Sequence, residues 1–227
     1  MSGSVIAQGR TRRAAAVNGV GLREQNRLDK LARIRVAAKE LFTEQGFERA
    51  TTRDIARRAH VGLGTLFNYA DDKRDLVFLI FNEELDRITD RGFDAANPRH
   101  TLVGQLTAAF SVFYRAFAEN PTLSRALLQE LTFYSRGRLA DDFQRSRRRT
   151  IGRIEQLVSQ AQRARQLRRS ADPALVALGI FFLYSGSVRW WIAADRPDPK
   201  VGIAALRRLL ELNLAGVLVK ARRISIR

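Results

Sequence analysis

Residues 51–69 decide the fold, and they read TTRDIARRAHVGLGTLFNY. Thr51 is an N-cap residue, and Asp54 three positions later completes an approximate capping box, with Asp in place of Glu or Gln. A tight turn over His60-Val61-Gly62 ends this short helix, and a second short helix follows over about residues 63–69. Two short helices joined by so tight a turn predict a helix-turn-helix.

The two helices of this motif have an apolar side and an outward side. The inward side chains are Ile55, Ala59, Val61 and Leu66, and the outward ones on the second helix are Thr65, Asn68 and Tyr69. Gly62 and Gly64 open the second helix, so its backbone amides can approach DNA closely. Arg53 and Lys73 flank the outward side, which predicts a phosphate clamp around a base-reading helix.

Upstream of the motif, the sequence predicts one helix preceded by a tail. The apolar stripe of that helix consists of Ile34, Ala38, Leu41 and Phe42. Gly46 is expected to end it in a left-handed conformation. Residues 1–25 are rich in Gly, Ser, Ala and Arg without periodicity, so we expect a basic, disordered tail. The alternative is a basic arm that follows DNA phosphates or a minor groove.

Downstream of the motif, Pro and Gly divide the chain into six further helices. Asp71 or Asp72 caps the first, which extends to the region of Asn97-Pro98. The other five are predicted over about residues 101–119, 121–135, 141–168, 172–195 and 199–222. No strand-like alternation stands out, so the predicted fold is all-α, with a three-helix head and a six-helix body. The predicted parts are a tail at 1–25, a helix-turn-helix domain at 26–71 and a body at 72–222.

The charge of the chain points to a polyanionic partner. The 227 residues carry 40 Lys and Arg against 23 Asp and Glu, a formal net charge of +17. Only five of the 40 are Lys, and Arg suits bidentate contacts to phosphates and guanine edges. Nucleic acid is therefore the expected partner. The alternative explanation of the Arg excess is a high-GC coding bias.

Several classes of protein are excluded by composition. Without Cys there are no disulfides, thiolate metal sites or Cys nucleophiles, and two His cannot form a His-rich metal site. The sequence shows no nucleophile–base pair and no metal cluster, so we expect no cofactor, no metal and no enzymatic activity. The longest uncharged apolar stretch, residues 174–188, is shorter than the ~20 residues of a membrane span. Without a signal peptide either, the expected location is the cytoplasm.

An ordered set of short motifs runs through the head. They are Phe42-Thr43-Glu44-Gln45-Gly46-Phe47, Thr51-Thr52, Ile55-Ala56, Ala59-His60-Val61, Gly64-Thr65-Leu66-Phe67 and Asp72-Lys73. Over about residues 30–78 this set resembles the TetR family of bacterial repressors. The resemblance implies a homodimer that binds double-stranded operator DNA through two heads, and a body, residues 72–222, for dimerisation and ligand binding.

The resemblance also implies which residues contact DNA. Carried over position by position, they are Thr52, Arg53, Leu63, Gly64, Thr65, Phe67, Tyr69 and Lys73, and the outward side adds Asn68. This sequence departs from the family pattern at four positions. His60 replaces the Gly of the turn, Gly62 replaces a Ser or Thr cap, Phe67 replaces Tyr, and Ala70 replaces Phe. A His can adopt a positive φ, so the turn is expected to survive.

For the body, the resemblance implies a pocket among the helices of about residues 72–195. The candidate lining residues are large and apolar: Phe81, Phe110, Phe113, Phe117, Leu131, Tyr134 and Phe182. Such stripes are first of all core, but a wall of this kind would select an apolar small-molecule effector, such as a fatty acyl, aromatic or drug-like compound. Arg115 or Arg189 could meet an anionic end, and a hydroxyl could come from Tyr114, Tyr134 or Tyr184.

The last two helices are apolar on more than one side. In the first of them, one stripe consists of Leu178, Phe182 and Ser185, and the other of Ile180, Tyr184, Ser187 and Trp191. In the second, one consists of Ile203, Leu206, Leu210, Leu214 and Val217, and the other of Leu209, Leu212 and Gly216. One side can close the subunit core while the other needs a partner, and the resemblance implies a homodimer through these two helices.

Two further interpretations of the sequence stay open. The Arg-rich run 145–149 is expected to be a solvated helix face, and the alternative is a second patch for DNA or a partner. The best functional hypothesis is a ligand-responsive repressor that binds a palindromic operator. The alternatives are a non-specific basic DNA-binding protein, or an all-α protein, enzymatic or not, that binds small molecules or lipids.

Overall fold

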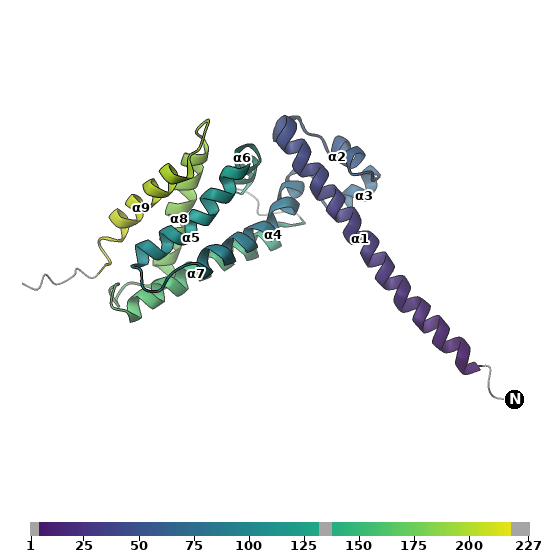
Figure 1. The fold of residues 1–227 in the computed structure, drawn as a ribbon, viewed down its shortest axis with the longest axis horizontal. Helices are drawn as coiled ribbons and strands as arrows, with labels where there is room; N and C mark the ends of the chain where they lie inside the picture. Colours follow the sequence, from purple (N-terminus) through teal and green to yellow (C-terminus); the bar gives the residue numbers. More distant parts are fainter. Residues whose placement is uncertain (1–4, 132–137, 219–227) are drawn as a thin grey trace, which may run out of the picture. The chain divides into compact units, whose positions relative to one another are not determined.

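The computed structural model describes residues 5–131 and 138–218, with side chains from residue 21 on. These residues form nine helices (Figure 1). Their bounds are α1 Val5–Arg49, α2 Thr52–Arg58, α3 Leu63–Phe67, α4 Lys73–Asp94, α5 Leu102–Glu119, α6 Pro121–Glu130, α7 Ala140–Arg163, α8 Pro173–Ile192 and α9 Pro199–Leu214. Extended pairing in the described residues is limited to one isolated antiparallel bridge between Leu167 and Leu218. The predicted all-α fold is confirmed.

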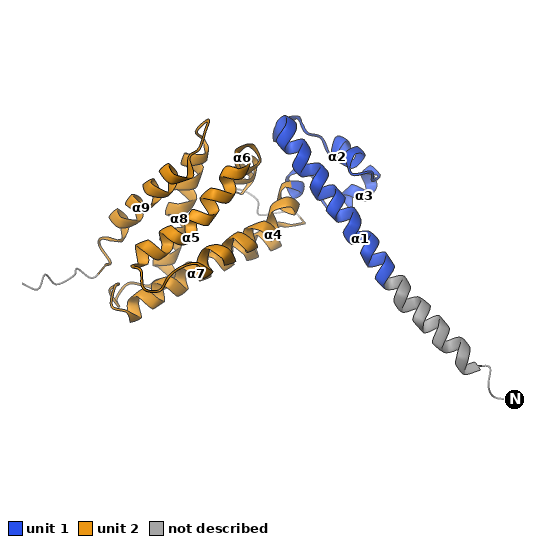
Figure 2. Ribbon diagram, viewed as in Figure 1, with its two compact units in different colours: residues 1–76 blue, residues 77–227 orange. Residues whose placement is uncertain are grey.

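The chain divides into two compact units, residues 1–76 and residues 77–227 (Figure 2). Unit 1 contains α1, α2, α3 and the first turn of α4, and unit 2 contains the rest of α4 and α5 to α9. The division therefore falls inside α4, a few residues after the sequence-based boundary between residues 71 and 72.

Helix α1 begins earlier than the sequence predicts. It starts at Val5, where the sequence indicates an irregular tail over residues 1–25. The reason is that Ala and Arg, which are frequent in this stretch, are strong helix formers, and no Pro interrupts them. At its other end, Gly46 breaks the helix with a φ of 80°, as expected for a glycine stop.

The local structure of the helix-turn-helix matches the sequence closely. The Thr51 hydroxyl oxygen accepts a hydrogen bond from the Asp54 amide at 3.1 Å and donates to the Asp54 carboxylate at 2.6 Å. The predicted N-cap bond is present, but the Asp54 carboxylate accepts from the Thr51 hydroxyl and not from the Thr51 backbone N–H, so only half of the capping box forms. His60 adopts a φ of 53°, so the turn forms although the residue is not Gly. Ile55, Ala59 and Leu66 are buried, as predicted for the inward side, whereas Val61 is only half-buried.

Short polar caps set the starts of the helices in unit 2. Three helices begin with an acceptor side chain that caps a backbone N–H, followed by Pro at the first helical position. The capping residues are Asn120, Asp172 and Asp198. Helix ends are less predictable, because they depend on packing. Helix α6 ends at Glu130 instead of about residue 135, α7 at Arg163 instead of 168, and α9 at Leu214 instead of 222.

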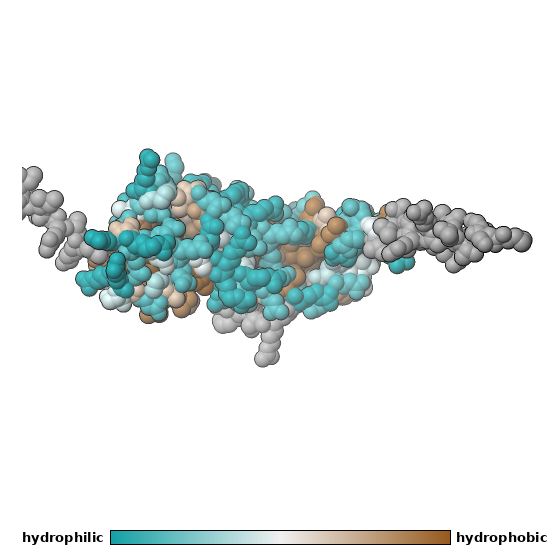
Figure 3. Space-filling view, turned by 90° about the horizontal axis from the view of Figure 1, so that it is seen from below, coloured by the Kyte–Doolittle hydropathy of each residue, from teal (hydrophilic) through white to brown (hydrophobic). Residues whose placement is uncertain are grey.

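An aromatic cluster forms the centre of unit 2. The Phe110 ring of α5 stacks on the Tyr184 ring of α8 with centroids 4.2 Å apart, and Tyr114 packs against Trp191 at 4.7 Å. Helix α9 closes on this cluster at Gly202, where an added Cβ would lie only 2.5 Å from Tyr114 Cε1. Around this core, the face drawn in Figure 3 is mostly hydrophilic, with apolar surface confined to smaller patches.

Helix α8 is the one helix among the described residues that is long and apolar enough to cross a membrane by length and composition. It exceeds the apolar stretch 174–188 because the helix continues through Arg189 to Ile192. Its side chains Ile180, Tyr184 and Val188 are buried in unit 2, but only 33% of its apolar stretch is buried in this structure. A single helix of this kind does not by itself indicate a membrane protein.

Candidate DNA-binding and ligand-binding sites

The outward side of α2 and α3 is open to solvent at the positions that the sequence predicts. Arg53, Gly64, Phe67 and Asn68 are exposed, and the remaining predicted DNA-contacting residues, Thr52, Leu63, Thr65, Tyr69 and Lys73, are half-buried. An added Cβ on Gly64 would meet no atom within 4 Å, so the backbone of α3 is accessible there. A double helix could therefore approach the start of α3 closely.

The arginines of α2 differ in their partners. The guanidinium of Arg57 pairs with Asp54 at 2.5 Å, and that of Arg58 pairs with Glu44 at 2.7 Å. Arg53, at the start of the helix, is exposed and forms no ion pair within the described residues. Its positive charge is the one on α2 that is not already compensated by a described carboxylate, which suits a phosphate contact.

Two of the predicted contact residues are bound within unit 1. The Tyr69 hydroxyl donates to the backbone oxygen of Arg27 at 3.1 Å. The Lys73 ammonium donates to the backbone oxygen of Glu48 at 3.1 Å and lies 4.4 Å from the centre of the Phe47 ring. These contacts tie α1 to the segment after α3, so both side chains support the position of α3 in addition to any contact with DNA.

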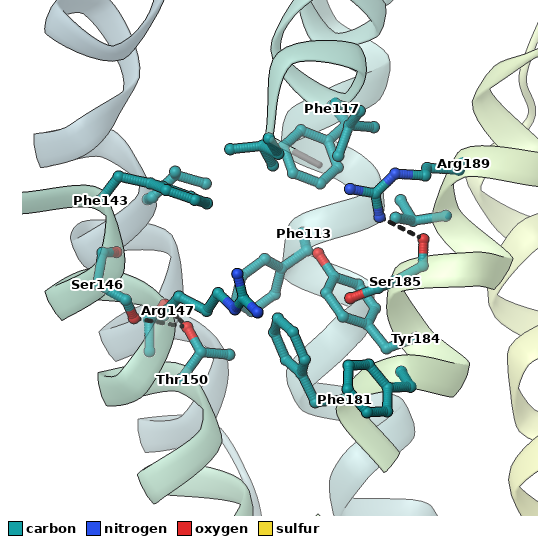
Figure 4. A pocket seen from close by; sticks show the side chains of 16 residues that line it. Phe113, Phe117, Phe143, Ser146, Arg147, Thr150, Phe181, Tyr184, Ser185 and Arg189 are labelled. Carbon is teal, nitrogen blue, oxygen red and sulfur yellow. Dashed lines mark hydrogen bonds between the residues drawn. The ribbon is translucent and has the colours of Figure 1, made fainter. Parts of the chain in front are cut away.

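A cavity of about 390 Å³ lies within unit 2, in the size range of small-molecule sites (Figure 4). Five helices and the residue that follows α6 contribute side chains to it. The lining residues are Leu85, Thr89, Phe113, Phe117, Leu128, Leu131, Phe143, Ser146, Arg147, Thr150, Phe181, Phe182, Tyr184, Ser185, Val188 and Arg189. Most of this wall is apolar, and it includes no Asp or Glu.

The structure separates the predicted lining residues into two groups. Phe113, Phe117, Leu131 and Phe182 line the cavity. Phe110 does not, because its ring is stacked on Tyr184 in the core, and Phe81 is buried elsewhere in α4. Tyr134 lies outside the described residues. Among the anion-binding candidates, Arg189 reaches the cavity, whereas Arg115 donates to the Ser111 hydroxyl on its own helix.

Sequence reasoning missed the contribution of α7. Its cavity-lining side chains are Phe143, Ser146, Arg147 and Thr150, which recur at helical spacing within the Arg-rich run and just beyond it. The interpretation of residues 145–149 as a solvated face is therefore wrong for Ser146, which is buried, and for Arg147, which is half-buried. The helical spacing of Phe143, Ser146 and Thr150, which places them on one side of α7, could have identified these lining residues from the sequence.

Two arginines and one tyrosine hydroxyl face this mostly apolar cavity from α7 and α8. In Figure 4 the Arg147 side chain extends from α7 toward Phe113, and the Tyr184 hydroxyl and the Arg189 guanidinium point inward from α8. Arg189 donates to the Ser185 backbone oxygen at 2.9 Å. Burial lowers the pKa of Arg189, and the positive charge of Arg147 acts in the same direction. Burial also raises the pKa of the Tyr184 hydroxyl well above its usual range.

Helices α8 and α9 each bury one side and expose the other. Ile180, Tyr184 and Trp191 of α8 and Leu206, Leu210 and Leu214 of α9 are buried, which assigns these stripes to the subunit core. The exposed large apolar side chains are Leu175, Phe182 and Trp190 of α8 and Val201, Leu209 and Leu212 of α9. So much exposed apolar surface on two adjacent helices is typical of an interface.

Both parts of the chain match known families. Residues 34–80 match a family described as bacterial regulatory proteins, tetR family, and residues 100–210 match one described as tetracyclin repressor-like, C-terminal domain. Together the two matches span the helix-turn-helix and most of unit 2.

Relatives along most of the chain are named as transcriptional or metabolic regulators. The chain is 24% identical to the HTH-type transcriptional activator FasR of Mycolicibacterium smegmatis over 79% of this chain and 81% of that protein. It is 22% identical to the fatty acid metabolism regulator protein of Bacillus subtilis over 80% and 92%. Thermus thermophilus FadR, a TetR-family repressor solved with lauroyl-CoA, shares the fold with a TM-score of 0.66, at 23% identity over 85% and 97% of the two chains.

Proposed function

The chain belongs to the TetR family of bacterial regulatory proteins, and from this premise we propose that it is a ligand-responsive repressor that binds a palindromic operator as a homodimer. Members of this family are DNA-binding transcriptional regulators, not enzymes. The observation that carries the proposal for this chain is the open side of α2 and α3, where Arg53 and the backbone at Gly64 are accessible.

The proposed DNA contacts divide by chemistry. Thr65 is placed to meet base edges from α3, and Arg53 is placed to meet a phosphate, because its guanidinium has no described carboxylate partner. Tyr69 and Lys73 hold α3 in position through their contacts to Arg27 and Glu48. Direct contacts of these two residues to DNA remain part of the proposal.

The proposed dimer uses the exposed sides of α8 and α9, including Phe182, Trp190 and Leu212. Two copies related by a two-fold axis would bury both stripes in one four-helix interface. The two DNA-binding units then enter successive major grooves about 34–36 Å apart. A ligand that changes this separation by a few ångströms removes contacts on both half-sites at once.

The proposed ligand is a mostly apolar small molecule of the fatty-acyl class, bound in the cavity of unit 2. The aromatic wall supports this class, and Thermus thermophilus FadR, which was solved with lauroyl-CoA, has the same fold. The ligand must bind the DNA-incompetent arrangement more tightly than the competent one, because equal affinity for both would shift nothing. The proposed site of action is the bacterial cytoplasm, where the operator lies.

Selection of operator sequences from randomised duplexes with the full-length protein tests the DNA-binding part. We expect enrichment of one palindrome, and Thr65→Ala should then weaken binding to it by about 1–3 kcal/mol while leaving non-specific DNA unaffected. Arg53→Ala should weaken all sequences alike and reduce the salt dependence by about one ion. Arg163→Ala, the same charge change on an exposed residue of unit 2, is the matched control.

Two outcomes would contradict this part of the proposal. Enrichment of no sequence would favour a non-specific DNA-binding protein, and unchanged affinity of both variants would place the contact surface elsewhere. Transcription from the selected operator in vitro, with and without the protein, distinguishes repression from activation. FasR, which is named an activator, makes this a necessary measurement.

A further inference from the structure

We propose that the cavity of unit 2 binds its ligand through an anionic group held inside the cavity by Arg147 and Arg189, so that the effector is an apolar carboxylic acid rather than an uncharged apolar molecule. This inference rests on the proposed ligand-binding function and specifies its chemistry. It is carried by two guanidinium groups and one hydroxyl that face the same mostly apolar cavity (Figure 4).

Arg147 differs from its neighbours on α7 in what it faces. Arg145, Arg149 and Arg153 are paired with Asp142, Asp90 and Asp94, respectively. Arg147 is half-buried, lines the cavity, and has no ion pair or hydrogen bond with any residue that the structure describes. A guanidinium that has left bulk water without a partner is costly, and a bound anion would remove that cost.

Arg189 faces the same space from α8. It is half-buried and close enough to Arg147 for the positive charge of Arg147 to lower its pKa. Its guanidinium donates to the Ser185 backbone oxygen at 2.9 Å. Among the described residues that line the cavity there is no Asp or Glu. Two like charges held together in this way form a favourable site for an anion.

The Tyr184 hydroxyl completes the polar set. It points into the cavity in Figure 4 and forms no hydrogen bond with a described residue, although its ring is held by the stack on Phe110. With its pKa raised well above the usual value by burial, the hydroxyl stays protonated at neutral pH and can donate to an anion. One hydroxyl donor and two guanidinium groups therefore face the same cavity.

The rest of the wall defines the other end of the ligand. Phe113, Phe117, Leu128 and Val188 offer apolar surface to a chain or ring. A cavity of about 390 Å³ is in the range that a small molecule fills. Because Arg147 and Arg189 stand among these apolar side chains, the anionic group that they hold belongs to the same molecule as the apolar part. A carboxylate fits best, because its two oxygens match the planar guanidinium fork.

Titration calorimetry of the full-length dimer with dodecanoate, dodecan-1-ol and dodecanoyl-CoA tests the proposal. We expect dodecanoate to bind about tenfold to a hundredfold more tightly than dodecan-1-ol, the range for hydrogen bonds to a charged group. Arg147→Gln and Arg189→Gln should each weaken dodecanoate by a similar factor and leave dodecan-1-ol within twofold. Arg148→Gln is the matched control, because Arg148 is adjacent on α7, exposed, and does not line the cavity.

Each outcome has a distinct meaning. Equal affinity of the wild-type protein for dodecanoate and dodecan-1-ol overturns the charge inference and leaves the proposed apolar ligand site intact. This comparison needs no variant, so it holds even where a substitution impairs folding. If dodecanoyl-CoA binds and loses as much affinity as dodecanoate in the Arg147→Gln protein, the carboxylate assignment is overturned. Absence of binding by all three probes overturns the fatty-acyl part of the proposed function together with this inference.

Discussion

Replacing Trp190 by Glu tests whether the exposed sides of α8 and α9 form the dimer interface. Trp190 is 87% exposed within one subunit, so the substitution removes little from the subunit core. A Trp side chain offers roughly 200 Å² of surface, of which about 170 Å² would remain for a partner to cover. At about 25 cal/mol per Å² this amounts to roughly 4 kcal/mol for each copy.

The expected effect on the dimer is smaller than the sum over both copies. Two-fold symmetry doubles the figure to about 8 kcal/mol, but partial burial and side-chain ordering offset part of it. We expect about half of this sum, roughly 4 kcal/mol, to be lost from the free energy of dimerisation. A loss of this size raises the dimer dissociation constant about a thousandfold. Introducing two carboxylates near the two-fold axis acts in the same direction.

Sedimentation velocity between about 0.1 and 50 µM measures the dissociation constant, with circular dichroism as the check on folding. Val36→Glu is the matched control, because Val36 is 56% exposed on α1 in unit 1 and should leave the dimer unchanged. A folded Trp190→Glu protein with the wild-type dissociation constant would refute the interface. So would a Val36→Glu protein that dissociates as readily.

Three further predictions concern unit 2. Phe113→Trp should fill part of the cavity and abolish dodecanoate binding while operator affinity is kept, as calorimetry and gel shifts can measure; intact binding would mean that the ligand lies elsewhere. In urea unfolding, Gly202→Ala should lower the free energy of unfolding by about 1–2 kcal/mol, because the added Cβ would overlap Tyr114. Gly152→Ala, in open space on α7, should raise it by about 0.5–1 kcal/mol. If both variants change the free energy of unfolding in the same direction, the packing described at Gly202 is contradicted. Burial raises the pKa of Tyr114 to about 12, so on raising the pH the unfolded chain loses the Tyr114 proton before the folded chain does. The free energy of unfolding should therefore fall as the pH rises from about 10 toward 12. Tyr114→Phe should make the free energy of unfolding depend less steeply on pH in this range, and an unchanged pH dependence would refute the contribution of Tyr114.

The helix-turn-helix was predictable because its determinants are local. The N-cap bond between Thr51 and Asp54, the turn at His60 and the helix break at Gly46 each depend on residues within one turn of the chain. The Pro residues that start α6, α8 and α9 act in the same way, through a fixed φ and a missing N–H. By itself, therefore, the sequence determined the all-α class, the DNA-binding motif and the starts of most helices.

The candidate ligand site depended on tertiary packing. Phe110 and Phe113 lie on the same helix and look alike in sequence, yet Phe110 stacks on Tyr184 in the core while Phe113 lines the cavity. Arg147 lies in a run of arginines that reads as solvated, and only the way α7 packs beside α5 and α8 turns it inward while Arg145 and Arg149 pair outside. Helical periodicity indicates which side chains share a side of a helix, but the neighbours of that side come from segments far away in the chain. Only the tertiary structure decided which apolar stripe became core, cavity or exposed surface, because each outcome requires the same kinds of residue and differs only in what packs against them.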